Sequence, residues 1–185
     1  MRAACGLAVL LFWMGPAPGE SDNLRAIRRA MALLPRPPST VAVIDAEDAR
    51  PGVRELLLTL DAFITRGGRV VYLVKESAVL KGAAQGSRFY DCMLAGILWH
   101  EMAHVDGADE LGARRAERDL WTGFVRDQRV DEMTALRYLR ALDAQSLEVL
   151  DHHEVAAGID LPPVQNHVGS ITPKAGRPPS APRKP

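Results

Sequence analysis

Cysteine, aromatic residues and an excess of either charge are all scarce in this sequence. The chain of 185 residues contains 2 cysteines and 5% aromatic residues, and its 23 basic side chains equal its 23 acidic ones. Because proteins that bind nucleic acid through its phosphates carry a basic excess, we expect no nucleic-acid partner. The rest of the composition, 47% hydrophobic and 25% charged, is typical of a globular domain with its own core.

The scarcity of cysteine excludes a disulfide framework. Cys5 lies in an N-terminal segment that we expect to be removed, so Cys92 would be the single cysteine of the mature chain. We interpret Cys92 as a small apolar residue packed on its helix. The domain must therefore be stabilised by its core and by any bound metal.

The longest N-terminal apolar run is too short to cross a membrane comfortably. Residues 1–19 contain Arg2, then an apolar segment, then small residues around Ala17, which is the pattern of a secretory signal peptide. A membrane span needs about 20 apolar residues. We expect a secreted or periplasmic protein without membrane contact once the signal is cleaved, or a membrane-anchored protein if it is retained.

Composition and periodicity divide the chain into three parts. Residues 1–19 are the predicted signal peptide, and residues 20–160 have the periodic apolar pattern of one folded domain. Residues 161–185 are rich in proline and basic residues, cannot bury a core, and are predicted to be disordered.

The central part is predicted to be a mainly helical α+β domain. Ser21 or Asp22 caps the first helix, and Leu111 is among the side chains expected to face the core. The predicted helices cover residues 22–34, 51–60, 110–126, 131–142 and 146–157, and residues 40–44 form a short buried strand.

A small sheet or hairpin is predicted before the central helix. Residues 61–65 could extend the preceding helix or form the first arm of a hairpin that turns at residues 66–68. The two glycines, Gly67 and Gly68, and the β-branched stretch at residues 69–74 favour the hairpin.

The most informative stretch is residues 94–117, in which an apolar run leads into the pentapeptide His-Glu-Met-Ala-His at 100–104. On a helix, His100 and His104 project from one face on adjacent turns and can share one metal ion. Glu101 lies about 100° around the same helix, where its carboxylate could act on a metal-bound water without ligating the metal.

A catalytic zinc ion needs a third protein ligand, and two glutamates are candidates. Glu110 and Glu117 are seven residues apart and share a helix face, so periodicity does not choose between them. We favour Glu110, because Gly107 allows a sharp turn after His104. The other glutamate would then accept a hydrogen bond from a ligand histidine.

These residues resemble the zincin superfamily of zinc metallopeptidases. The stretch from His100 to Glu110 reads H-E-x-x-H-x-x-G-x-x-E and is similar to the metzincin pattern, which ends in histidine. Glu110 departs from that rule, and Met133 lies in a helical pattern rather than in a Met-turn. In the gluzincin branch the third ligand is a glutamate on a separate downstream helix, a description that Glu117 fits.

The resemblance implies a zincin-like domain that hydrolyses peptide bonds in a peptide or protein substrate. His100, His104 and Glu110 would hold Zn²⁺, and Glu101 would take a proton from water as the general base. The alternative is a non-catalytic zincin-like binding or scaffold protein, whose metal site is structural or degenerate.

The resemblance also suggests roles for residues outside the motif. A strand just upstream of the metal helix would form the edge of the cleft, where an extended peptide could pair with it, and residues 69–76 are the candidates. The alternative is an internal strand without a substrate role. Tyr138 could stabilise an oxyanion, but we favour a position in the core.

Overall fold

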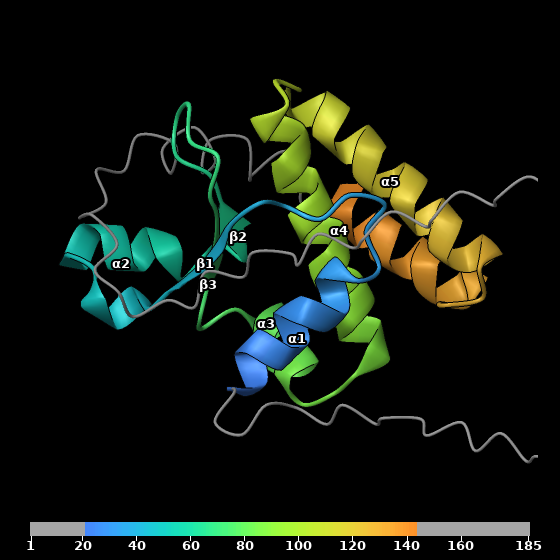
Figure 1. The fold of residues 1–185 in the computed structure, drawn as a ribbon, viewed down its shortest axis with the longest axis horizontal. Coiled ribbons are helices and arrows are strands. Elements are labelled where there is room, and N and C mark those ends of the chain that lie inside the picture. Colours follow the sequence, from blue (N-terminus) through green and yellow to red (C-terminus); the bar gives the residue numbers. More distant parts are fainter. Residues whose placement is uncertain (1–20, 144–185) are drawn as a thin grey trace, which may run out of the picture.

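The structure is a computed structural model that describes residues 21–143. The predicted signal peptide at 1–19, the helix predicted over 146–157 and the tail at 161–185 lie outside the described residues. The described elements are α1 (Asp22–Met31), β1 (Val41–Ile44), the 3-10 turn η1 (Ala46–Asp48), α2 (Pro51–Leu57), β2 (Ala62–Phe63), β3 (Val71–Val74), α3 (Ala78–Ala84), α4 (Arg88–Val105) and α5 (Glu110–Arg126), followed by a helix at residues 132–143. The α+β class is therefore confirmed (Figure 1).

The sheet has three strands in the order β1-β3-β2. β1 and β3 are parallel, with Val41 opposite Val71. β2 and β3 are antiparallel, with Ala62 opposite Leu73, which confirms the predicted hairpin. Its turn is closed by a hydrogen bond of 2.8 Å from the Gly68 backbone N–H to the carbonyl oxygen of Thr65.

β3 is the central strand of this sheet, which corrects one expectation. Both of its edges already pair, with β1 on one side and β2 on the other. An extended peptide therefore cannot add to it, because no backbone edge is available. Of the two interpretations of residues 69–76, the internal strand is correct.

The elements form layers on both sides of the sheet. α2 and η1 cover one face, where Leu57 and Phe63 belong to a small apolar cluster. α4 lies on the other face, between the sheet and α5 (Figure 1). Since side chains alternate along a strand, Tyr72 faces the first cluster and Leu73 the main core.

α4 is the buried centre of the main core. It contacts α1, α3, α5, β2 and β3, and an ion pair between Arg29 Nε and Asp91 Oδ2 at 2.9 Å joins it to α1. Cys92 is fully buried, as predicted. No helix among residues 21–143 is both long and apolar enough to cross a membrane.

Most predicted helix boundaries agree with the structure to within a few residues. α5 begins at Glu110, the first residue of the predicted helix, with Asp109 as its N-cap, and Ser21 rather than Asp22 caps α1. α2 ends at Leu57, three residues before the predicted end at residue 60. The inward placement predicted for Leu111 is wrong, since 58% of this residue is exposed.

Candidate metal centre

A tight turn after α4 brings the start of α5 back beside the end of α4. Gly107 has φ of +91°, a conformation that favours glycine. The Gly107 N–H donates to the His104 carbonyl oxygen at 2.9 Å, and the Ala108 N–H donates to the Ala103 carbonyl oxygen at 2.9 Å. This is a Schellman motif, and it ends α4 within one residue of the second histidine.

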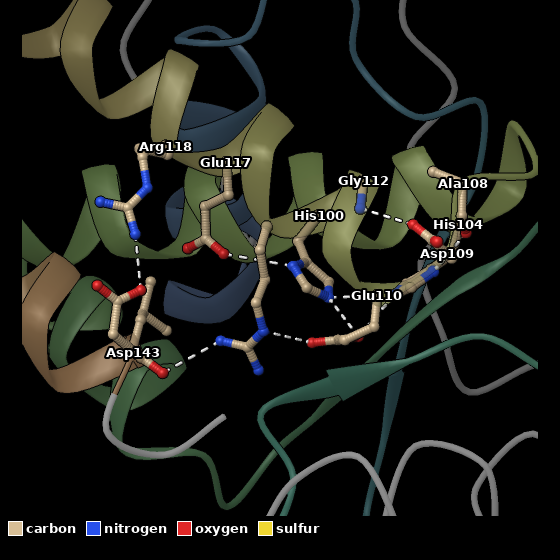
Figure 2. A network of polar contacts seen from close by, with 11 residues as sticks. His100, His104, Ala108, Asp109, Glu110, Gly112, Glu117, Arg118 and Asp143 are labelled. Atoms are coloured by element: carbon tan, nitrogen blue, oxygen red, sulfur yellow. Dashed lines mark hydrogen bonds and ion pairs between the residues drawn. The ribbon is translucent and has the colours of Figure 1, made fainter. Parts of the chain in front are cut away.

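The N-terminus of α5 is fixed immediately after this turn. Asp109 caps the helix by accepting a hydrogen bond of 2.7 Å from the Gly112 N–H. Glu110 is thereby the first residue of α5 and projects toward the last turns of α4 (Figure 2). The geometry expected from Gly107 is the observed one.

Three potential metal-binding atoms converge at this point. The Nε2 atoms of His100 and His104 are 3.1 Å apart. Oε2 of Glu110 lies 3.2 Å from Nε2 of His104 and 3.4 Å from Nε2 of His100 (Figure 2). Among the described residues, these three side chains form the group that could hold a metal ion.

The opposite nitrogen of each imidazole faces an acceptor. Nδ1 of His104 is 3.0 Å from the Ala108 carbonyl oxygen, and Nδ1 of His100 is 3.3 Å from Oε2 of Glu117. An acceptor at Nδ1 favours the tautomer with the proton on that nitrogen, which leaves a lone pair on Nε2. Two lone pairs and a carboxylate oxygen then face each other, an arrangement that a cation between them would stabilise.

The donor set fits zinc. Ligands at about 2.0–2.2 Å from a tetrahedral zinc ion are separated by about 3.3–3.6 Å, close to the observed 3.1–3.4 Å. Two imidazoles and one carboxylate are also a combination found in catalytic zinc sites, which keep the fourth position for water or substrate. The side chains of His104 and Glu110 are 17% and 16% exposed, so neither donor is fully buried.

The carboxylates beside the two imidazoles favour positive charge on the imidazoles, as the directions of the pKa shifts indicate. Burial opposes protonation of His100, but its contacts with Glu110 and Glu117 outweigh burial and raise its pKa to about 9. The contact with Glu110 also raises the pKa of His104. Burial would raise the pKa of Glu110, but the two histidines hold it well below its usual range. Without a metal, protons take up this charge, and a metal must displace them.

Glu101 stands apart from the three donors. It is only 2% exposed, and its Oε2 has no hydrogen-bond partner among the described residues. Burial raises the pKa of Glu101 to about 7, although the charges of His100 and His104 partly offset this. A carboxyl group with a pKa near neutrality is suited to accept and release protons at physiological pH.

The two candidate glutamates occupy different positions. Glu110 reaches the Nε2 atoms of both histidines, whereas Glu117 reaches Nδ1 of His100. Glu117 is almost fully buried, and its Oε1 accepts a hydrogen bond of 2.9 Å from the hydroxyl of Tyr138. The geometry thus places Glu110 among the donors and Glu117 outside them.

Two arginines of α5 connect the helix at residues 132–143 to the site. Arg114 Nε lies 2.7 Å from Oε1 of Glu110, and its Nη1 donates to the Leu142 carbonyl oxygen at 3.1 Å. Arg118 pairs with Asp143 at 2.6 Å (Figure 2). Arg114 therefore holds the oxygen of Glu110 that does not face the histidines.

A glycine in α4 makes room for Glu117. Gly96 lies one turn before His100, and a Cβ atom added there would be 2.9 Å from Nε1 of Trp121 and 3.0 Å from Oε1 of Glu117. The Trp121 ring is fully buried and packs on Tyr138 with a centroid distance of 4.3 Å. The indole is therefore not free to move aside.

We expect Gly96→Ala to destabilise the protein by about 1–3 kcal/mol, because the added methyl group overpacks this contact. Gly123→Ala in α5 is the matched control, since its added Cβ would have Arg126 Nη2 as its nearest neighbour at 3.8 Å. It should stabilise by about 0.5–1 kcal/mol through helix propensity. Denaturant unfolding measures both, and a stabilised Gly96→Ala would contradict the contact.

Sequence interpretation missed three contributors to the site. The Ala108 carbonyl carries no signal in residue type, because any residue supplies a backbone oxygen. Arg114 lies outside the H-E-x-x-H-x-x-G-x-x-E pattern, so the motif does not single it out. Gly96 could have been noticed as a glycine inside an apolar helical run, where it often marks a close approach. Tyr138 lies near the core as favoured, but its hydroxyl contacts Glu117.

A separate hollow of about 400 Å³ opens beside α5. Its lining combines apolar residues, among them Leu33, Trp99 and Leu120, with charged residues such as Asp119 and Arg126. None of the three donor residues lines it.

Comparison with protein-family models, with curated proteins and with solved structures gives no match to this chain. The assignment of a candidate metal centre is therefore supported by the geometry of its residues alone.

Proposed function

We propose that this chain is a zinc-dependent hydrolase of peptide bonds. The observation that carries the proposal is the convergence of His100 Nε2, His104 Nε2 and Glu110 Oε2 within 3.1–3.4 Å. The acceptors at both Nδ1 atoms support it, since they direct the lone pairs of the imidazoles toward the shared point. The chemistry of these donors favours zinc over calcium or magnesium, which take oxygen ligands.

When bound, zinc supplies a Lewis acid that polarises a carbonyl group and makes water acidic near neutral pH. His100, His104 and Glu110 hold it. Glu101 accepts a proton from the attacking water and passes it to the leaving amine, because its raised pKa lets it carry the proton near neutrality. Arg114 orients Glu110 by binding its other oxygen.

Peptide bonds are proposed as the substrate from the resemblance to zincins, carried by the H-E-x-x-H pattern at residues 100–104 and the glycine at 107. The signal-like composition of residues 1–19 supports action outside the cytoplasm. A structural metal site, the alternative, needs four protein ligands. Residues 21–143 bring together three such side chains.

Zinc binding and hydrolysis by the full chain test the proposal together. We expect one zinc ion per chain by elemental analysis of protein purified without chelator. Hydrolysis of an unstructured protein substrate should stop on addition of a chelator and return with zinc. Zinc binding without hydrolysis would favour the structural alternative, and an absence of zinc binding would refute both.

A further inference from the structure

We propose that Tyr138 is a positioning residue for the metal centre, acting through Glu117 on His100. This inference depends on the proposed zinc site and extends it to the helix at residues 132–143. It assigns the tyrosine hydroxyl the task of orienting a carboxylate rather than contacting a substrate.

The contacts that run from Tyr138 through Glu117 to His100, which we call the relay, are continuous and buried. The Tyr138 hydroxyl donates to Oε1 of Glu117 at 2.9 Å, and Oε2 of the same carboxylate faces Nδ1 of His100 at 3.3 Å (Figure 2). Only 4% of the Glu117 side chain is exposed. Two oxygens of one carboxylate thus connect the tyrosine to the imidazole without solvent between them.

The groups around the relay restrict its geometry. The ring of Tyr138 packs on Trp121, and Trp121 itself contacts Phe89 and Phe124 edge-on. On the other side, Gly96 leaves the space that the Glu117 carboxylate fills. The carboxylate is therefore packed from both sides, and the hydrogen bond from the hydroxyl restricts its rotation about the last side-chain bond.

The chemical consequence concerns the tautomer of His100. With Oε1 occupied by the hydroxyl, Oε2 is directed to accept the Nδ1–H of His100, which leaves Nε2 as a lone pair for the metal. Without the hydroxyl, Oε1 loses its donor and the carboxylate can rotate. The imidazole then loses part of its orientation, and metal affinity falls.

Zinc titration of the full-length protein against a competing chelator tests the relay. We expect Tyr138→Phe to lower zinc affinity about three- to tenfold, from the loss of one hydrogen bond to a carboxylate. Tyr72→Phe is the matched control. It removes a hydroxyl on β3, where the ring stacks on Phe63 at 5.2 Å, and should leave zinc affinity unchanged.

A double-mutant cycle separates positioning from packing. In a Glu117→Ala background, Tyr138→Phe should cause no further loss of zinc affinity, because the hydroxyl no longer has a carboxylate to orient. The visible absorption of bound Co²⁺ should change in Tyr138→Phe and not in Tyr72→Phe, since it reports the coordination geometry. An equal loss in both backgrounds would show a packing effect and overturn the inference.

The outcomes distinguish this inference from the proposed function. Wild-type protein that binds zinc, together with an unchanged affinity of Tyr138→Phe, overturns the relay alone. Wild-type protein that binds no zinc overturns the metal centre and the relay with it. If Tyr138→Phe did not fold, an unchanged zinc affinity of Glu117→Ala would still overturn the relay.

Discussion

Glu101→Gln is expected to reduce hydrolysis about 100- to 10,000-fold, the usual contribution of a general base, while zinc binding persists. Glutamine has the same shape but cannot accept a proton near neutral pH. The side chain is buried and lies outside the group of three donors, so its replacement leaves the metal ligands in place. Hydrolysis rates and zinc content, measured on the same preparation, check this expectation.

Glu101→Gln should also change the free energy of unfolding of the protein. The sign of this change follows from the raised pKa of Glu101. Burial raises the pKa of Glu101 from its ordinary 4.5 to about 7, so folding disfavours the ionised form. That penalty grows as pH rises from about 4.5 to 7 and persists above it. Glu101→Gln removes the penalty, so the metal-free variant should be more stable than wild type above about pH 7.

The control for this prediction is Glu47→Gln. Glu47 lies on η1 and pairs with Arg54 at the surface, so its loss should change neither hydrolysis nor zinc content. Hydrolysis by Glu101→Gln at the wild-type rate would remove Glu101 from its proposed role. The zinc proposal would stand in that case, since it depends on other residues.

Glu110→Ala is expected to lower zinc affinity by roughly a hundredfold or more, above the ~10–100-fold expected of Glu117→Ala. The first substitution removes one of three donors and leaves Arg114 beside the site. An unpaired guanidinium at that position also repels a cation. Glu117→Ala leaves the three donors intact and removes the carboxylate that faces Nδ1 of His100 and accepts the Tyr138 hydroxyl.

Parallel zinc titrations of the two variants decide between the glutamates. At a zinc concentration just sufficient to saturate wild type, Glu110→Ala should purify largely without metal and Glu117→Ala should retain part of it. The reverse order would assign Glu117 as the ligand and would require the α4–α5 contact to differ from the observed one.

Much of the local structure follows from the sequence, because it depends on neighbouring residues. Asp109 caps α5 and Gly107 ends α4 through contacts with residues a few positions away. Both helix ends can therefore be predicted from neighbouring residues in the sequence. The helical period likewise places His100 and His104 on one face. Its two glycines favour the hairpin before α4 for the same reason.

Other features depend on contacts between distant residues. The central position of β3 is decided by pairing with β1, some 30 residues earlier, and no periodicity within β3 records which of its edges are occupied. Leu111 fits an apolar helical pattern but is exposed, because it lies two positions before Ala113 and therefore on the side of α5 away from the buried Ala113 and Glu117.

Residue type and spacing are enough to identify the side chains that could bind a metal, namely His100, His104 and the two glutamates. The difference between the glutamates follows from the packing of the two helices. Both lie on one face of α5, but the turn at Gly107 brings Glu110 to the Nε2 atoms, and the close approach at Gly96 brings Glu117 to the other side of the His100 ring. That difference depends on how α4 and α5 pack against each other. The spacing of residues along one helix gives no information about this packing.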